Sequence, residues 1–283
     1  MRRAGSLEQP DARVESGGHP IDSTFGTPFD LNLIGLWTLY LKEVRRFLKV
    51  PGQTLLAPVV TTLMFLLIFT LALGRAGRTI DGLPFLEFLA PGLVMMAVIQ
   101  NAFANTSSSI LIGKIQGNIV DVLMPPLRPA ELMFGIVAGG VTRGLLVALA
   151  VSLAMLPAVS LGLNHPLLVV YYALSGSLML ALLGLLGGLW AEKFDQMATV
   201  TNFVITPLSF LSGTFYSIAE LPGPFLVAAY LNPFFYLIDG LRFGFTGHAD
   251  GPILIGAVAV AAVNAGLWAL AHALIARGWR LKA

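Results

Sequence analysis

The chain has 283 residues, of which 56% are hydrophobic and only 11% charged, and it carries a formal net charge of +2. Soluble globular domains carry about 25% charged residues, so this composition excludes an ordinary water-solvated domain and indicates a membrane protein. The absence of cysteine from the sequence excludes disulfides and thiolate metal ligands.

The N-terminal part of the sequence predicts a tail followed by a surface helix. Residues 1–30 are rich in Gly, Pro, Ser and charge, which is typical of a disordered tail. In residues 31–50, apolar side chains recur every three or four positions, and a basic face is formed by Lys42, Arg45, Arg46 and Lys49. This amphipathic helix is too short to cross a bilayer, so we expect it at the membrane surface with its cations on anionic headgroups.

Six apolar runs follow and predict six transmembrane helices in one membrane domain, residues 31–283. The runs cover residues 54–74, 88–112, 131–156, 166–190, 197–218 and 252–276. Thirteen Lys and Arg residues lie on the side of the two termini and three lie on the other. Cationic loops stay in the cytoplasm, so both termini and the tail are expected there, and these cations indicate topology rather than nucleic-acid binding.

Residues 213–251, before the last run, form an apolar segment interrupted by Pro222, Pro224 and Pro233. Each half is too short to cross the membrane. We therefore expect two short re-entrant or interfacial helices whose backbone is covered by protein. The predicted fold is an all-α membrane protein with six spans, an N-terminal interfacial helix and these re-entrant helices.

The apolar runs contain few groups that could supply energy or chemistry. Asp and Glu lie at span edges or in loops, the four histidines are scattered without metal-ligand spacing, and no phosphate-binding G-x-x-x-x-G-K-[ST] occurs. A permease driven by an outside energy source fits this pattern. An ion-gradient-driven secondary carrier and an intramembrane enzyme or passive scaffold stay open as alternatives at this point.

The stretch GNIVDVLMPPLRPAEL, residues 117–132, lies in a loop that the charge count places in the cytoplasm. Residues 114–124 favour a short helix with an apolar side, and Pro125, Pro126 and Pro129 prevent its extension. An exposed apolar side is costly in water, which favours a docked protein partner.

Two motifs make the chain resemble the type-2 class of ABC exporter permeases. One is K-x-x-G-x-x-x-x-x-L-x-x-P from Lys114 to Pro126, and the other is FLSGTFYSIAELPGPFLVAAYLNPFFYLIDGLR at 210–242. The resemblance implies a non-enzymatic permease that pairs with a second copy of itself and with two copies of a separate ABC ATPase, where ATP and Mg bind. It also implies that the loop after the second span is the coupling element. Those candidates are Lys114, Gly117, Asp121, Leu123, Pro125, Pro126 and Glu131.

The same resemblance implies that the segment before the last span is an extracellular lid. Its candidate residues are Leu221, Pro222, Asn232, Pro233 and Arg242.

Polar side chains within the spans are candidates for the substrate pathway. Asn101, Asn105 and Ser108 repeat at helical spacing in the second span, as do Asn202, Thr206 and Ser209 in the fifth, with Tyr216 beyond them. Family structure implies that both spans flank the dimer axis, although interhelical hydrogen bonding explains such stripes equally well. Arg143, near the middle of the third span, needs a polar partner or wet surroundings, and contact with substrate headgroups is the functional reading.

The sequence therefore predicts a bacterial inner-membrane permease that exports an amphipathic, lipid-linked, glycan or drug-type molecule by alternating access, with membrane lipids as its surroundings.

Overall fold

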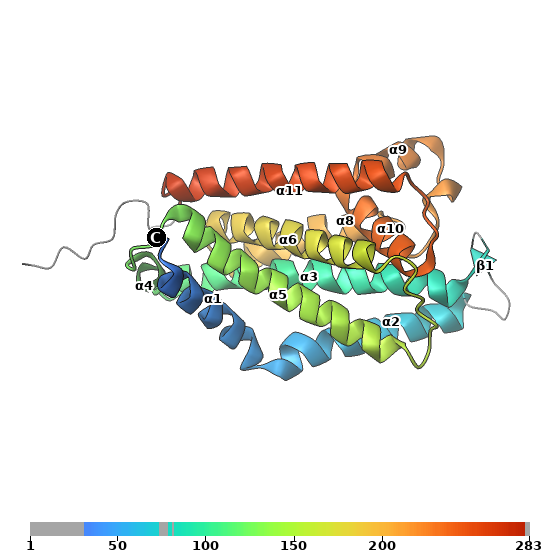
Figure 1. Cartoon of the computed structure of the whole chain (residues 1–283), viewed down its shortest axis with the longest axis horizontal. Helices are drawn as coiled ribbons and strands as arrows, with labels where there is room; N and C mark the ends of the chain where they lie inside the picture. The colour runs from blue at the N-terminus through green and yellow to red at the C-terminus, as the bar shows by residue number, and fades with distance from the viewer. Residues whose placement is uncertain (1–30, 74–78, 81, 281–283) are drawn as a thin grey trace, which may run out of the picture. The chain divides into compact units, whose positions relative to one another are not determined.

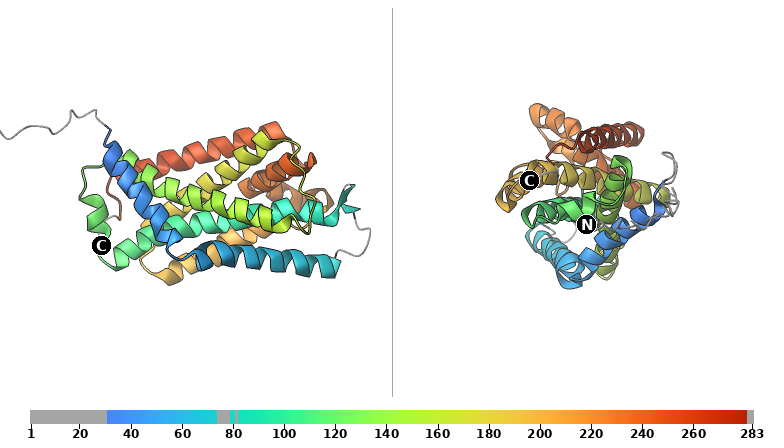
Figure 2. Two further views of the ribbon diagram at one scale, coloured as in Figure 1. Left: turned by 60° about the horizontal axis from the view of Figure 1, so that its bottom comes forward. Right: turned by 90° about the vertical axis from the view of Figure 1, so that its left-hand side faces the viewer.

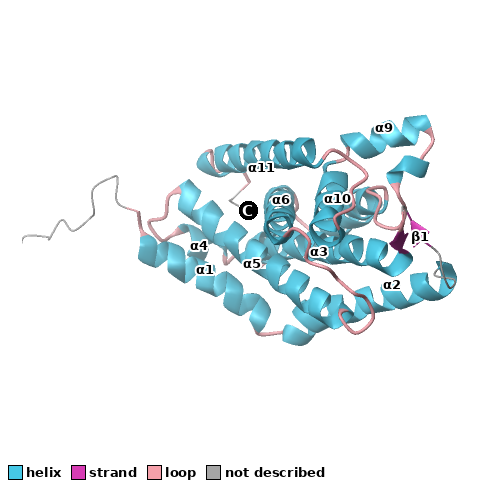
Figure 3. Cartoon of the chain, turned by 45° about the vertical axis from the view of Figure 1, so that its right-hand side comes forward, coloured by secondary structure: helices cyan, strands magenta, loops and turns pink. Residues whose placement is uncertain are grey.

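The computed structural model describes residues 31–73, 79–80 and 82–280. Contacts divide the chain into two units, Met1–Leu31 and Asn32–Ala283, and every helix and strand given below belongs to the second. The predicted tail at 1–30 lies outside the described residues. Figure 3 shows that the described residues of the second unit form helices and the loops between them, apart from a small hairpin. The prediction of an all-α membrane fold is confirmed.

The long helices are α2 (Ala57–Leu73), α3 (Phe85–Ile115), α5 (Pro129–Met155), α6 (Pro166–Trp190) and α11 (Ile253–Ala276). Shorter helices are α1 (Leu33–Leu48), α4 (Ile119–Leu123), α7 (Phe194–Val200), α8 (Thr206–Phe210), α9 (Gly223–Leu231) and α10 (Pro233–Thr246). Two π-helical turns, η1 (Gly52–Leu56) and η2 (Thr201–Ile205), precede α2 and α8, and η3 (Ile218–Glu220) is a 3₁₀ turn. Strands β1 (Thr79–Ile80) and β2 (Leu83–Pro84) pair antiparallel.

Five helical stretches are long and apolar enough to cross a membrane within the described part of the chain, and the sequence predicted all of them. They are Gly52–Ala72, Phe85–Ile115, Pro129–Met155, Pro166–Trp190 and Ile253–Ala276. A sixth arises if α9 and α10, which meet at 83°, are taken as one broken span or re-entrant loop. The predicted helices before the last span are thus present, and their depth in the membrane stays a prediction.

The run predicted at 197–218 forms a shorter helix than expected. It is helical from Phe194 through η2 to Phe210, and residues 211–217 are not helical. Gly213 takes a positive φ of 71°, which a continuing α-helix cannot accommodate. The helix end therefore reflects backbone geometry that hydropathy does not report.

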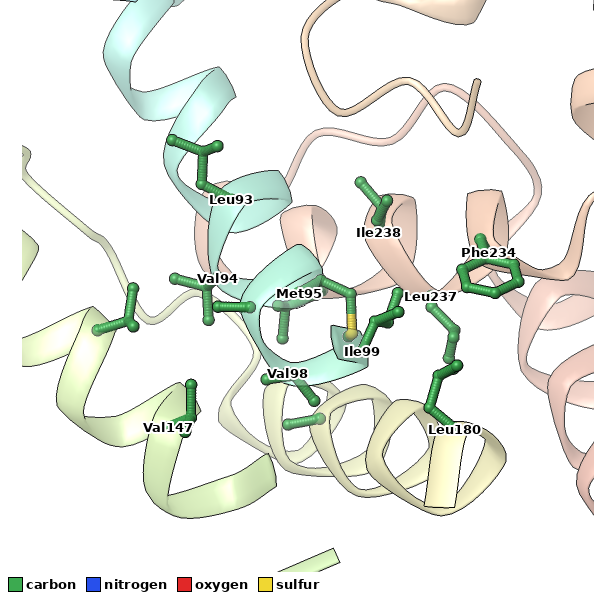
Figure 4. Packing of buried hydrophobic residues seen from close by; sticks show 14 of the residues in the cluster. Leu93, Val94, Met95, Val98, Ile99, Val147, Leu180, Phe234, Leu237 and Ile238 are labelled. Atoms are coloured by element: carbon green, nitrogen blue, oxygen red, sulfur yellow. The ribbon is translucent and has the colours of Figure 1, made fainter. Parts of the chain in front are cut away.

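Helix α3 is the centre of the domain. In its most apolar stretch 78% of the residues are buried, against 11% for η1–α2 and 17% for α11. Figure 4 shows its Val94, Met95 and Ile99 among side chains of α5, α6 and α10. Helices α2, α5, α6 and α10 pack against it, whereas α11 packs on α6 and α10, on the far side of α6 from α3 (Figure 1 and Figure 2). The faces of α2 and α11 that this packing leaves uncovered remain available to lipid or to a partner.

Small residues let the neighbouring helices approach α3 and α5 closely. A β-carbon at Gly184 of α6 would clash with the backbone oxygen of Phe103 on α3. One at Gly139 of α5 would lie 2.5 Å from the Glu43 β-carbon of α1. Gly139 and Gly184 therefore mark close packing contacts, as is usual for small residues of helices in membranes.

Candidate coupling segment and intramembrane polar cluster

The loop between α3 and α5 holds α4 at the same end of the domain as the start of α1, opposite β1 and α9 (Figure 1). Gly117 takes φ +74°, a left-handed conformation that suits glycine and turns the chain after α3. Pro129 starts α5, because a proline in the first helical turn sacrifices no hydrogen bond. The short helix predicted at 114–124 is present only as α4, Ile119–Leu123, because Lys114 and Ile115 continue α3 and the turn at Gly117 separates the two helices.

Helix α4 has a buried side and an exposed apolar side. Ile119 is 5% exposed and packs in a cluster with Leu39 and Ile110. Val120 and Met124 are 54% and 75% exposed. The candidates Gly117, Asp121, Pro125 and Pro126 are exposed too, and the side chain of Leu123 lies outside the described set. An exposed apolar surface on a rigidly held turn is the kind of surface that a protein partner covers.

Glu131, another coupling candidate, is buried and joins two helices. One carboxylate oxygen accepts a hydrogen bond from the Asn32 backbone N–H at 2.9 Å, and the other accepts from the Arg128 N–H at 2.8 Å. Carboxylates stabilise helix N-termini because they satisfy free N–H groups. Glu131 thus binds the beginning of α1 to the beginning of α5.

Lys114 turns inward rather than toward the outer face of α4. Its ammonium group donates to the carbonyl oxygens of Leu189 and Ala191 at 2.9 and 2.7 Å. These carbonyls end α6, where a cation stabilises the helix dipole. Lys114 therefore connects α3 to the end of α6 and to the turn before α7.

The basic face of α1 is split by a buried ion pair. Lys42, Arg45 and Lys49 are exposed. Arg46 instead bonds to Glu43 at 3.0 Å, and the Glu43 side chain has no solvent exposure. Arg46 also donates to the Asn105 backbone oxygen at 2.7 Å and to Ser108 at 3.1 Å.

The Glu43 carboxylate also reaches α3 directly. Ser109 donates its hydroxyl to Glu43 at 2.8 Å. Sequence reasoning missed Glu43 and Ser109. The available signal was one acidic residue, three positions before Arg46, in an otherwise basic helix.

Arg143 finds its partner on α3. One guanidinium nitrogen donates to the Asn101 side-chain oxygen at 2.8 Å. Asn101 and Asn105 thus each accept a hydrogen bond from an arginine of another helix. The stripe of Asn101 and Asn105 therefore makes hydrogen bonds between helices. These bonds are compatible with a packing role and with a substrate-pathway role.

The second polar stripe changes from exposed to buried along its length. Asn202 is exposed, Thr206 is half-buried, and Ser209 is buried and donates to the Ile205 carbonyl at 2.7 Å. Tyr216, beyond the stripe, packs beside Ile218, and burial raises the pKa of its phenol. The pathway role of both stripes stays a prediction.

Arg242 is the centre of the segment predicted as an outer lid. It is fully buried, lies over the Phe88 ring at 3.7 Å and donates to the backbone oxygens of Phe88 and Gly213. Asp239 and Asp250 lie 3.8 Å from its guanidinium. Arg242 therefore joins α10 to α3 and to the turn after α8.

Asn232 holds the bend between α9 and α10. Its side-chain oxygen accepts from the Phe234 N–H at 3.1 Å, and its amide donates to Leu208 and Ser212 at 2.8 and 2.9 Å. Pro233 begins α10. Leu221 and Pro222 lie just before α9, half-buried and exposed respectively. The bend is thus fastened to the end of α8.

Among the residues that the structure describes, no three His, Asp or Glu side chains lie together in a way that could hold a metal ion.

The family of this chain follows from comparison with known proteins. The profile of the ABC-2 type transporter family matches residues 35–246, and the chain belongs to this family. Its members are membrane permeases that normally work with an ABC ATPase on a separate subunit.

Two groups of relatives are similar over most of their length. The chain is 34% identical over 249 residues to the inner membrane transport permease YadH of Escherichia coli K12, covering 88% of this chain and 97% of that one. It is 27% identical over 224 residues to nodulation protein J of Rhizobium leguminosarum bv. trifolii, covering 77% and 82%. The predicted resemblance is confirmed, and the chain is a transport permease of the ABC exporter class.

Proposed function

We propose that two copies of this chain form the transmembrane part of an ABC exporter in a bacterial inner membrane, with two copies of an ATPase that bind ATP and Mg. The exported molecule is amphipathic: lipid-linked, glycan-bearing or drug-like. Transport follows alternating access, in which ATP binding favours one state of the permease through its different affinity for the two states.

The exposed apolar face of α4 carries this proposal. Val120 lies on α4 and Met124 is its C-cap residue, and Ile119 of the same helix packs against α1 and α3. Lys114 and Glu131, on either side of α4 in the chain, bond the end of α3 to α6 and the start of α5 to α1. We infer that movement of α4 is passed to these helices. The same face would fill a groove on the ATPase, because removal of such apolar side chains from water favours association.

A paired substitution tests this surface. Val120 on α4 and Val227 on α9 are 54% and 59% exposed, at opposite ends of the domain. The permease is expressed with the ATPase that its neighbouring gene encodes and is purified by a tag on the permease. V120D is expected to lose the co-purifying ATPase, whereas V227D retains it. Equal retention by both variants contradicts the assigned docking surface.

ATP turnover tests the exporter activity itself. The purified complex, reconstituted in vesicles, is screened with lipids, glycans and drugs for stimulated ATP hydrolysis and for movement of the stimulating compound. Uphill movement by the permease alone on a proton or sodium gradient contradicts the proposal and supports a secondary carrier.

A further inference from the structure

The cluster of charges between α1, α3 and α5 contains more positive than negative groups. Glu43 is the carboxylate that the described structure places within ion-pair distance of Arg46 and Lys42. Its two oxygens already accept from Arg46 and Ser109. In the described part of the chain, Arg143 forms no ion pair within 4.0 Å.

Arg143 also has unused hydrogen-bonding capacity. Its Nε is buried and has no hydrogen-bond partner among the described residues, and the same holds for the amide nitrogen of Asn105. Arg46 and Arg143 bond to Asn105 and Asn101, which are about one helical turn apart on α3. A cation in the middle of a span is costly, so an anion bound nearby offsets part of that cost.

A polar cavity lies one hydrogen bond away from this cation. Asn101, which accepts from Arg143, lines a cavity of about 220 Å³ between η1–α2 and α3. Gln53, Thr61 and Gln100 line it as well, beside apolar side chains of both helices. No hydrogen bond is made by the side chains of these three residues within the described structure, so their donors are free for a ligand.

We propose that this cavity, the Arg143 cavity, binds the anionic headgroup of the exported amphiphile, a phosphate or carboxylate whose charge Arg143 compensates. The amides and hydroxyl of the wall donate hydrogen bonds to the headgroup. Arg143 does not line the cavity itself but is bonded to Asn101 in its wall, and from there it supplies the compensating positive charge. The apolar side chains beside the wall accept the start of the hydrocarbon chain. This inference rests on the proposed export function and narrows its substrate class to anionic amphiphiles.

The lack of cysteine in the sequence makes a direct test simple. The full-length Q100C chain is placed in nanodiscs of zwitterionic lipid and labelled with an uncharged maleimide. Hexadecyl phosphate is expected to slow labelling much more than hexadecyl maltoside does. A chain carrying V227C on α9 is the matched control, and its labelling rate is expected to be the same with either compound.

Charge variants identify the cation responsible. R143Q in the Q100C chain is expected to weaken protection by hexadecyl phosphate at least about tenfold, because it removes the positive charge next to the cavity wall. R143K retains most of the protection because it keeps the charge. R277Q, which removes one cation from the end of α11, has no effect.

Several results overturn the inference. Equal protection of Q100C from labelling by hexadecyl phosphate and by hexadecyl maltoside overturns the inference, even if R143Q fails to fold. Protection by inorganic phosphate at the same concentration as hexadecyl phosphate shows a free-anion site and also contradicts it. The assay needs neither nucleotide nor transport, so its failure leaves the proposed exporter standing, and failure of ATP-driven transport leaves a positive binding result intact.

Discussion

The ion pair between Glu43 and Arg46 should be worth several kcal/mol to the folded domain. E43A removes two hydrogen bonds from Arg46, at 3.0 and 3.2 Å, and the acceptor of Ser109. Breaking a buried pair costs about 3 to 5 kcal/mol. Arg46 keeps its bond to the Asn105 oxygen and is 29% exposed, so we expect about 3 kcal/mol, at the lower end.

R46A should cost more, about 4 kcal/mol, because Glu43 has no solvent exposure and would be left buried with its charge poorly compensated. The double variant should lose about 4 rather than about 7 kcal/mol, which gives a coupling energy of about 3 kcal/mol.

The measurement is the free energy of unfolding in mixed micelles titrated with sodium dodecyl sulfate and followed by circular dichroism. K42A is the control, because Lys42 is 51% exposed and 3.6 Å from Glu43, and it should cost under about 0.5 kcal/mol. Additive losses in the double variant would refute the reasoning, since they would mean that the two side chains stabilise the domain independently.

Three further substitutions test the packing. G184L should destabilise the domain by about 3 kcal/mol, because the leucine side chain would clash with the α3 backbone. G266L is the control: Gly266 has open space around it, so this variant should cost under about 0.5 kcal/mol in the same titration. R242M removes the cation 3.8 Å from the buried carboxylates of Asp239 and Asp250, so we expect a loss of about 3 kcal/mol and a lower yield of folded protein by size-exclusion chromatography. K114M should lower the free energy of unfolding by about 1 kcal/mol and speed proteolysis at the turn after α6. An unchanged rate of proteolysis would contradict the capping role of Lys114.

Hydropathy alone located most of the membrane helices. Long apolar runs give α2, α3, α5, α6 and α11 because a helix is the simplest structure that satisfies every backbone group in lipid. The short helix α4 was also predictable, since the prolines at 125, 126 and 129 leave few positions that can be helical.

Hydropathy failed where tertiary contacts control the backbone. The helix through η2 stops at Phe210, although apolar residues continue, because the turn at Gly213 is held by Arg242 and by Thr214, which bonds to Ser209. Arg242, which holds this turn, is 29 residues from Gly213 in the chain, so a local sequence pattern cannot report its effect on the helix end.

At the candidate sites too, local sequence patterns located residues, whereas tertiary contacts determined their partners. Motif spacing marked the candidate coupling segment, whose role stays a prediction, and polar periodicity placed Asn101 and Asn105 on one face of α3. Their partners came from α1 and α5, which are distant in sequence. A helical stripe specifies which residues share a face, but not which neighbour that face meets.

The sequence by itself determined that this chain is a helical membrane protein of the ABC-2 family, because composition, hydropathy and two motifs are local properties. Only the tertiary structure decided that Arg46 points into the protein, that Lys114 caps α6 and that Arg143 bonds to Asn101 in the wall of a polar cavity. Those outcomes depend on which helices pack together, and in this chain close approach at small residues such as Gly139 and Gly184 sets that packing.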